Sequence, residues 1–282
     1  MTERLLICTD LDRTLIPNGH QPESANARPF FRELAARPEV CLAYVSGRDE
    51  GLLRSAIREY RLPVPDYAIG DVGTTIYQIE GEDWTPWSAW ARAIAPDWNG
   101  RDHAAIAALL TDVGEIEPQE PAKQNTYKLS YYASASIDGE TLADRLQKRL
   151  ADADVRASVI WSVDEVNEVG LLDVLPAGAT KVHAIRFLQE HLRVPDRHTV
   201  FSGDSGNDLP VLTSGLQSIV VANARDEIKR AARDALAAQG VSDRLYIAKG
   251  GFLGMNGNYA AGILEGVVHF VPAVRETLER MR

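Results

Sequence analysis

Short runs of apolar residues recur along the chain, and the segments between them carry apolar positions at helical spacing. Residues 5–9 (Leu-Leu-Ile-Cys-Thr) and 40–45 (Val-Cys-Leu-Ala-Tyr-Val) are almost entirely apolar, which is typical of strands buried on both faces. Residues 25–36 and 52–60 place their apolar side chains mainly on one side of a helix. This alternation of strand and helix predicts an α/β fold with a parallel sheet.

The pattern changes between residues 82 and 170, where strands and helices alternate less regularly. This region holds all five tryptophans, a strand-like run at 126–132, a predicted helix at 139–151 and a strand around 155–161. The first pattern returns near residue 171, with helices predicted at 180–189, from 209, at 224–238 and at 259–270, and strands at 199–202, 219–221 and 245–247. We therefore predict a core domain of residues 1–81 and 171–282, and an inserted α+β domain of residues 82–170.

The composition disfavours some classes of binding partner. The 282 residues include 30 Lys and Arg against 40 Asp and Glu, a formal charge of -10 that disfavours nucleic acid and anionic lipid. The chain has no uncharged apolar stretch long enough to predict a membrane span, and its first residues do not resemble a secretory signal. Cys8 and Cys41 lie in apolar runs, so we expect two buried, reduced thiols and a cytoplasmic protein.

Two carboxylates follow the first predicted strand directly, in Asp10-Leu11-Asp12-Arg13-Thr14. In open α/β sheets, ligands bind at the carboxyl ends of the strands, so these side chains are expected to face a binding site. Crowded carboxylates are costly unless they share a cation or a proton. A turn rich in Asp after a strand would also explain this motif, so alone it leaves the function open.

A second acidic motif follows another predicted strand, in Gly203-Asp204-Ser205-Gly206-Asn207-Asp208. Mg2+ prefers a small number of oxygen ligands and leaves room for water and a phosphate oxygen. The glycines permit the tight turns that such acidic side chains need to converge. A capped helix start would explain one of the two acids but not both.

Two weaker signals lie elsewhere in the core domain. Ser46-Gly47-Arg48 ends the second strand, where a hydroxyl and a backbone N–H are able to hold a phosphate oxygen, and Lys181 opens the first helix after the insert. Taken alone, each has an ordinary explanation, a helix N-cap for Ser46 and a solvated surface position for Lys181. The glycine-rich stretch 249–254 fits a mobile loop near the site or a plain connector equally well.

Taken in order, these motifs resemble the four motifs of the haloacid dehalogenase superfamily of phosphatases. Further stretches are similar to the sucrose-phosphate phosphatase group, namely residues 72–77, 128–131, 203–208 and 261–265. The resemblance covers nearly the whole chain and implies a Rossmann-like core with a parallel sheet and an inserted C2-type (Cof-like) cap domain. Three positions depart from the group's pattern: Arg13, Thr75 and Val182. The first two leave the exact sugar open.

The resemblance also implies a role for each motif residue. Asp10 would be the nucleophile that forms an aspartyl-phosphate, and Asp12 the general acid and base, with a proton favoured by the crowded acidic site. The metal ligands would be Asp10, the backbone carbonyl of Asp12, Asp204 and Asp208, the last as a ligand or as a residue that orients water or Lys181. The phosphate would be bound by Thr14, Ser46, Gly47, Lys181 and Asn207, and the sugar in the cap by Asn125 and Lys128.

The expected function is a Mg2+-dependent phosphatase acting on a phosphorylated disaccharide, most of all sucrose 6-phosphate. Alternatives within the group are mannosylfructose-phosphate, glucosylglycerol-phosphate and mannosyl-3-phosphoglycerate phosphatases. A hexose phosphomutase and a non-catalytic sugar-phosphate binding subunit of a glycosyltransferase are alternatives from other classes. Four ionised carboxylates and the one lysine give the site a charge of -3 before a phosphate arrives, which predicts an absolute metal requirement.

Overall fold

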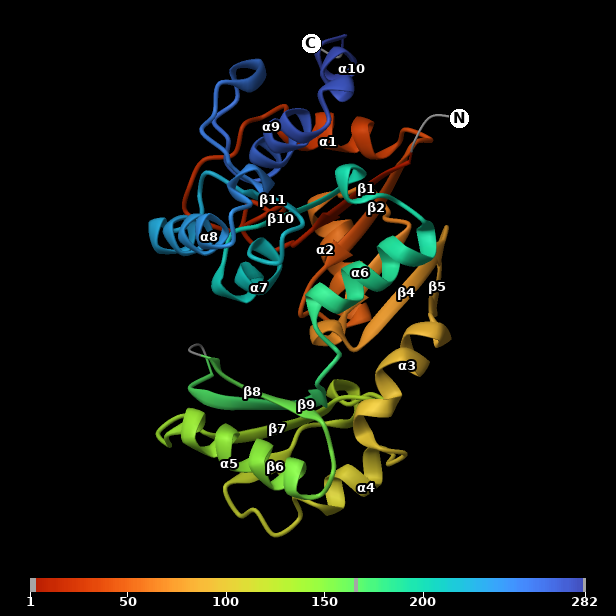
Figure 1. Ribbon diagram of the computed structural model, residues 1–282, viewed down its shortest axis with the longest axis vertical. Coiled ribbons are helices and arrows are strands. Elements are labelled where there is room, and N and C mark those ends of the chain that lie inside the picture. The colour runs from red at the N-terminus through yellow and green to blue at the C-terminus, as the bar shows by residue number, and fades with distance from the viewer. Residues whose placement is uncertain (1–3, 165–166, 281–282) are drawn as a thin grey trace. The chain divides into compact units, whose positions relative to one another are not determined.

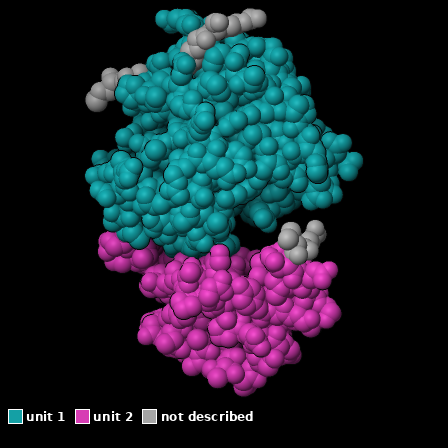
Figure 2. Space-filling model, turned by 180° about the vertical axis from the view of Figure 1, so that it is seen from behind, with its two compact units in different colours: residues 1–86, 181–282 teal, residues 87–180 magenta. Residues whose placement is uncertain are grey.

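The computed structural model describes residues 4–164 and 167–280, and the chain divides into two compact units. Unit 1 comprises Met1–Pro86 and Lys181–Arg282, and unit 2 comprises Trp87–Thr180 (Figure 2). The expected boundaries at residues 82 and 170 differ from this division. Residue 82 lies in the turn between two paired strands of unit 1, and residue 170 lies within a paired strand of unit 2. Backbone hydrogen bonds keep both segments in their units, so the junctions lie further along the chain.

Unit 1 is built on an eight-stranded sheet with the order β12-β11-β10-β1-β2-β3-β4-β5 (Figure 1). Its strands are β1 (Leu5–Thr9), β2 (Val40–Val45), β3 (Tyr67–Gly70), β4 (Thr75–Glu80), β5 (Asp83–Pro86), β10 (Thr199–Gly203), β11 (Gln217–Val220) and β12 (Leu245–Ile247). Strands β12 through β3 are parallel. Every residue of β1 and β2 is buried, as their apolar runs predict. The predicted α/β fold with a parallel sheet is confirmed.

The structure adds β4 and β5, which the sequence pattern did not predict as strands. They pair antiparallel with β3 and with each other at one edge of the sheet. The four residues of β5, Asp-Trp-Thr-Pro, are exposed or only partly buried and end in a proline, which edge strands tolerate. Such a strand has no apolar run and therefore gives little signal in the sequence.

The helices of unit 1 pack around this sheet. They are α1 (Ala27–Ala35), α2 (Glu50–Tyr60), α6 (Lys181–Leu192), α7 (Leu209–Leu212), α8 (Asp226–Ala238), α9 (Ala260–Phe270) and α10 (Arg275–Arg280). Helices α1 and α9 lie side by side (Figure 1), and α9 packs directly on β11. Gly266 permits that approach, since a Cβ there would lie 2.5 Å from Ile219.

Unit 2 has its own antiparallel sheet with the order β6-β7-β9-β8. Its elements are α3 (Ser88–Ile94), α4 (His103–Ala108), β6 (Ile116–Pro118), β7 (Leu129–Ser134), α5 (Gly139–Asp152), β8 (Ala157–Asp164) and β9 (Val169–Pro176). Helices α4 and α5 cover one face of this sheet (Figure 1), and a separate apolar core fills the space between them. The predicted strand at 126–132 starts later, at Leu129, because residues 125–128 form a turn.

Two expectations from composition can be compared with the structure. Cys8 and Cys41 are free and buried, as their apolar surroundings predicted. Within residues 4–164 and 167–280, no helix is both long and apolar enough to cross a membrane.

Candidate active site

The central parallel strands bring the sequence motifs of unit 1 to one edge of the sheet. β1 lies between β10 and β2, with Thr9 opposite Ser202 on one side and Tyr44 on the other. Because these strands are parallel, the loops that follow them leave the sheet at the same edge. Asp10 begins the first of these loops, and its backbone N–H donates to the carbonyl of Ser202 at 2.9 Å. This bond extends the strand pairing to the acidic residue and fixes its backbone.

Three buried carboxylates meet at this edge: Asp10, Asp204 and Asp208 are 7%, 3% and 0% exposed. One carboxylate oxygen from each lies within 4.8 Å of the others. Thr14 closes one side, since its hydroxyl donates to Oδ1 of Asp204 at 3.2 Å. A small set of convergent carboxylate oxygens is the donor set that Mg2+ prefers, so these residues fit the expected ion.

Lys181 joins two of the three carboxylates. It is the first residue of α6, and its Nζ donates to Oδ1 of Asp10 at 3.0 Å and to Oδ1 of Asp208 at 2.8 Å. Burial lowers the pKa of Lys181, but the charges of Asp10 and Asp208 outweigh burial and raise it above the ordinary lysine value. The lysine is therefore a fixed positive charge inside the cluster, and its interpretation as a solvated surface residue is wrong.

Asp208 has both oxygens engaged by donors of the chain. While Oδ1 accepts from Lys181, Oδ2 accepts from the backbone N–H groups of Asp204 (3.1 Å) and Ser205 (3.2 Å) and from the Ser205 hydroxyl. Gly203 allows this packing, because a Cβ there would lie 2.6 Å from that of Asp208. A helix cap is therefore present at this turn, formed by the side chains of Ser205 and Asp208, and Asp208 also orients Lys181.

Burial dominates the proton affinity of the other two acids. It raises the pKa of Asp10 to about 7, with Asp208 and Asp204 adding to the effect and Lys181 opposing it. Burial likewise raises the pKa of Asp204 to about 6, with Asp208 adding and Arg13 opposing. Two carboxylates that resist ionisation in this cluster would be ionised by a bound divalent cation, because the ion supplies the missing positive charge.

Asp12 lies outside this cluster of hydrogen bonds and is paired with Arg48. Nη2 and Nε of Arg48 donate to the two carboxylate oxygens at 2.6 and 2.8 Å, and Asn18 donates to Oδ1 at 2.7 Å. Burial raises the pKa of Asp12, but the bonds from Arg48 and Asn18 outweigh burial and leave it below the ordinary value. The expectation that crowding favours a proton on Asp12 is therefore wrong here, since its neighbours are cations and donors.

The remaining phosphate candidates differ in their surroundings. Ser46 is 2% exposed at the end of β2, and its hydroxyl accepts the backbone N–H of Arg48 at 3.2 Å. It is not the N-cap of α2, because Asp49 takes that position and accepts from Leu52. Gly47 and Asn207 are exposed. The structure thus brings Thr14 and Lys181 against the acidic cluster and leaves Ser46 beside the Arg48 backbone.

Sequence reasoning missed the roles of three neighbours of the motifs. Arg48 and Asn18 hold Asp12, and Arg13 lies with its Nε 3.4 Å from Oδ2 of Asp204. Arg48 belongs to the motif Ser46-Gly47-Arg48 and Arg13 is a departure from the family pattern, so the sequence held both signals but gave neither a role. Arg13 and Arg48 change the formal charge of the site. Together with Lys181 they place three cations beside four carboxylates, which gives -1 in place of -3.

In unit 2, the two sugar-binding candidates have different surroundings. Lys128 is 8% exposed and its Nζ lies 4.0 Å from Oδ1 of Asp173, which also accepts from the Ser130 hydroxyl at 2.5 Å. Asn125 turns its Oδ1 to the backbone N–H of Tyr127 at 2.9 Å, which stabilises the turn before β7. Lys128, Ser130 and Asp173 therefore form one polar group on the sheet, whereas this bond of Asn125 is local.

The tryptophans pack mainly in cores, as expected for most such residues. Trp98 is fully buried in unit 2, and Trp161 covers Gly139 and Gly170 so closely that neither position has room for a Cβ. Trp84 lies in unit 1 on β5, where it contacts Tyr77. Burial in a core leaves Trp98 no exposed surface for a sugar ring.

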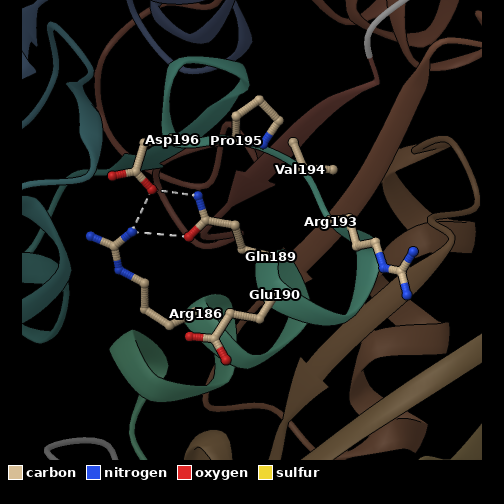
Figure 3. Close-up of a pocket in the computed structure, with 7 residues that line it drawn as sticks. All are labelled: Arg186, Gln189, Glu190, Arg193, Val194, Pro195 and Asp196. Carbon is tan, nitrogen blue, oxygen red and sulfur yellow. Dashed lines mark hydrogen bonds and ion pairs between the residues drawn. The ribbon is translucent and has the colours of Figure 1, made fainter.

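A cavity of about 470 Å³ at the C-terminal end of α6 is shown in Figure 3. Three of its polar side chains contact one another: Arg186 donates to Asp196 at 2.8 Å, and Gln189 donates to the same oxygen at 2.7 Å. The lining residues are Arg186, Gln189, Glu190, Arg193, Val194, Pro195 and Asp196. Lys181 lies at the other end of this helix, so the cavity is distinct from the acidic cluster.

Comparisons with known proteins agree with this geometry. The family described as sucrose-6F-phosphate phosphohydrolase matches residues 3–271. A HAD-like hydrolase of Nitrosococcus oceani is 54% identical over the whole chain and 76% of its own length. The mannosylfructose-phosphate phosphatase of Agrobacterium fabrum is 30% identical over 79% of this chain and 85% of its own.

A solved structure supports the same assignment. The sucrose-phosphatase of Synechocystis sp. PCC6803, in complex with sucrose and phosphate, has a TM-score of 0.71 and 27% identity, and the match covers 95% of this chain and 98% of that one. The chain spans about half the length of the plant sucrose-phosphatases that it matches. The family match covers nearly all of the chain. The chain therefore belongs to the sucrose-6F-phosphate phosphohydrolase family within the haloacid dehalogenase superfamily, and it is a phosphoric monoester hydrolase.

Proposed function

We propose that this chain is a Mg2+-dependent phosphatase that hydrolyses a phosphorylated disaccharide, with sucrose 6-phosphate as the leading candidate. The observation that carries the proposal is the buried group of Asp10, Asp204 and Asp208 around Lys181 at the tips of adjacent strands. A purely structural role does not need three carboxylates in one buried group, because their mutual repulsion is costly.

With Mg2+ bound, the residues of unit 1 would support a two-step transfer. An oxygen of Asp10 attacks phosphorus, the bond from phosphorus to the sugar oxygen breaks, and Asp12 gives a proton to that oxygen. Water then attacks the aspartyl-phosphate, Asp12 accepts a proton from the water, and the bond from phosphorus to Asp10 breaks. Asp12 must carry a proton in the first step, so Arg48 has to give up at least one of its two hydrogen bonds.

The contacts of the acidic cluster also support a way of holding the ion and the phosphoryl group. Asp10, Asp204 and the backbone carbonyl of Asp12 would hold Mg2+. Asp208, whose oxygens are already engaged, would chiefly orient Lys181. When bound, the ion polarises the phosphoryl oxygens and offsets the negative charge of the site. Thr14, Ser46 and Lys181 would bind phosphoryl oxygens, with Gly47 and Asn207 as exposed contributors from the neighbouring loops.

The sugar is proposed to be selected by unit 2, through the polar group at Lys128. Sucrose 6-phosphate is favoured by the family match and by the Synechocystis sucrose-phosphatase. Mannosylfructose-phosphate is the second candidate, because the Agrobacterium relative is 30% identical and matches over most of both chains. Association with a glycosyltransferase and a cytoplasmic location stay predictions.

A substrate panel tests this proposal. Release of inorganic phosphate would be measured with sucrose 6-phosphate, mannosylfructose-phosphate, glucosylglycerol-phosphate, mannosyl-3-phosphoglycerate and glucose 6-phosphate, with Mg2+ and after chelation. We expect fast release from a disaccharide phosphate only with Mg2+, and none from Asp10→Asn, while the exposed control Asp226→Asn stays active. A phosphomutase would instead yield an isomeric sugar phosphate, and a binding subunit would yield neither product.

A further inference from the structure

Arg13 lies between the proposed acid Asp12 and Thr14, in a backbone conformation that side chains other than glycine rarely adopt. Its φ is 59°, in the left-handed region. Two side chains hold it there: its N–H donates to Oδ1 of Asn18 at 2.7 Å, and its carbonyl accepts from Nδ2 of Asn223 at 2.6 Å. Strained backbone persists only where its surroundings fix it, and it is concentrated at functional sites.

Asn223 is itself held from a second loop. It is 4% exposed, and its Oδ1 accepts the backbone N–H of Tyr259 at 2.8 Å. Tyr259 also has a positive φ, of 51°. It directly precedes α9, at the end of the connection from β12 that contains the glycine-rich stretch 249–254. The conformation of Arg13 is therefore built by three separate parts of the chain.

This backbone directs the Arg13 side chain toward the acidic cluster. Its Nε lies 3.4 Å from Oδ2 of Asp204, and the side chain is 44% exposed, so the guanidinium lies between the cluster and solvent. Asp204 is 3% exposed and is one of the three carboxylates that converge. A fixed positive charge at this distance repels any cation that shares the same carboxylate.

We propose that Arg13 is a positioning residue of the metal site, which weakens the binding of the divalent cation by competing for Asp204. The inference rests on the proposed Mg2+ site. A guanidinium and a divalent cation a few ångströms apart at a partly exposed site repel strongly enough to change the dissociation constant about tenfold. Arg13 thereby keeps the ion exchangeable at a site where Asp10 and Asp204 would otherwise hold it more tightly.

Calorimetric titration of the metal-free full chain with MgCl2 at pH 8 tests this inference. We expect Arg13→Gln to bind Mg2+ about tenfold more tightly than the wild type, and Arg13→Lys, which keeps the charge, to bind within about threefold of it. The matched control is Arg233→Gln, which removes the same charge from an exposed position on α8. Melting temperatures without metal show whether each variant is folded, and Arg13→Asn, which tolerates a positive φ better, replaces Arg13→Gln if that variant unfolds.

The possible results distinguish the role of Arg13 from the proposed Mg2+ site. Tighter binding in Arg13→Gln with unchanged binding in Arg233→Gln supports the role of Arg13. Equal or weaker binding in Arg13→Gln, with normal binding by the wild type, overturns that role and leaves the metal site in place. A wild type that binds no Mg2+, like Asp204→Asn, overturns the metal site and the inference together.

Discussion

The folded chain disfavours ionisation of the Asp10 carboxyl group. Burial raises its pKa to about 7, with Asp208 and Asp204 adding to the effect, whereas its ordinary value is 3.8. The folded chain therefore holds a proton that the unfolded chain has lost between these pH values. Stability from this group is present at low pH and is lost as the pH rises through about 7.

Replacing this carboxylate should reveal that dependence. We predict that Asp10→Asn, which cannot ionise, raises the melting temperature of the metal-free protein by several degrees at pH 8 and has little effect at pH 4. Circular dichroism melts in the presence of a chelator measure this, with the exposed Asp234→Asn as the control. Equal pH dependence in wild type and Asp10→Asn would contradict the raised pKa.

Arg48 gives Asp12 a fixed orientation, since two nitrogens of one rigid guanidinium contact both carboxylate oxygens. We predict that Arg48→Gln lowers kcat for a sugar phosphate about 100-fold, because the acid is no longer positioned, with a smaller change in KM. The loss should be about tenfold smaller with p-nitrophenyl phosphate, whose leaving group departs without a proton. Steady-state kinetics on both substrates test this.

The control for Arg48 lies on the next helix. The salt bridge of Arg54 is to Glu50 within α2. Arg54→Gln therefore removes the same charge but leaves Arg48 on Asp12. It should leave both substrates unaffected. If Arg48→Gln slows both substrates by the same factor, Arg48 has no specific effect on proton transfer and the positioning role is wrong.

The turn after β10 depends on close contact between Gly203 and Asp208. A Cβ at Gly203 would lie 2.6 Å from the Asp208 Cβ, so Gly203→Ala must displace the acid that holds Lys181. We predict a loss of about 1–3 kcal/mol in the free energy of unfolding, and at least a tenfold loss of kcat. Gly206→Ala, where a Cβ meets nothing within 4 Å, should be nearly neutral in urea unfolding and in activity. Similar behaviour of the two variants would show that the turn has room to adjust.

The elements that the sequence predicted well are those whose apolar pattern matches their burial. β1 and β2 are almost entirely apolar and buried throughout, and α2 and α8 are amphipathic helices that bury one face. β5 was missed because its side chains are largely exposed at a sheet edge. The junction at residue 180 was placed too early, because the apolar pattern of β9 is the same whether its partners belong to unit 1 or unit 2.

At the candidate site, too, the sequence predicted what local motifs carry and missed what depends on contacts between residues distant in the sequence. Sequence order alone pointed to Asp10, Asp204 and Asp208, because each follows a strand in a motif with known chemistry. The partner of Asp12 was not predictable, since Arg48 is 36 residues away and its direction depends on how β2 lies against β1. Burial raises the pKa of Asp12, but the bonds from Arg48 and Asn18 outweigh burial, so crowding alone gave the wrong direction.

The chain divides into two compact units. The proposed catalytic residues lie in unit 1, and the polar group of Lys128, Ser130 and Asp173 lies in unit 2. If unit 2 recognises the sugar, Lys128→Gln should raise KM for the disaccharide phosphate about tenfold, because it removes a charged donor beside Asp173 that can bind hydroxyls. It should leave kcat/KM for p-nitrophenyl phosphate unchanged, since that substrate has no sugar to bind.

Lys148→Gln is the matched control, as it removes an exposed lysine from α5 in the same unit. Melting temperatures of both variants separate recognition from folding, because loss of the buried Lys128 charge removes the cation beside Asp173 and affects stability too. If Lys128→Gln is folded and loses activity equally on both substrates, the substitution affects the chemical step in unit 1 and not sugar binding. An unchanged KM for the disaccharide phosphate would remove Lys128 from the sugar site and leave the catalytic assignment of unit 1 untouched.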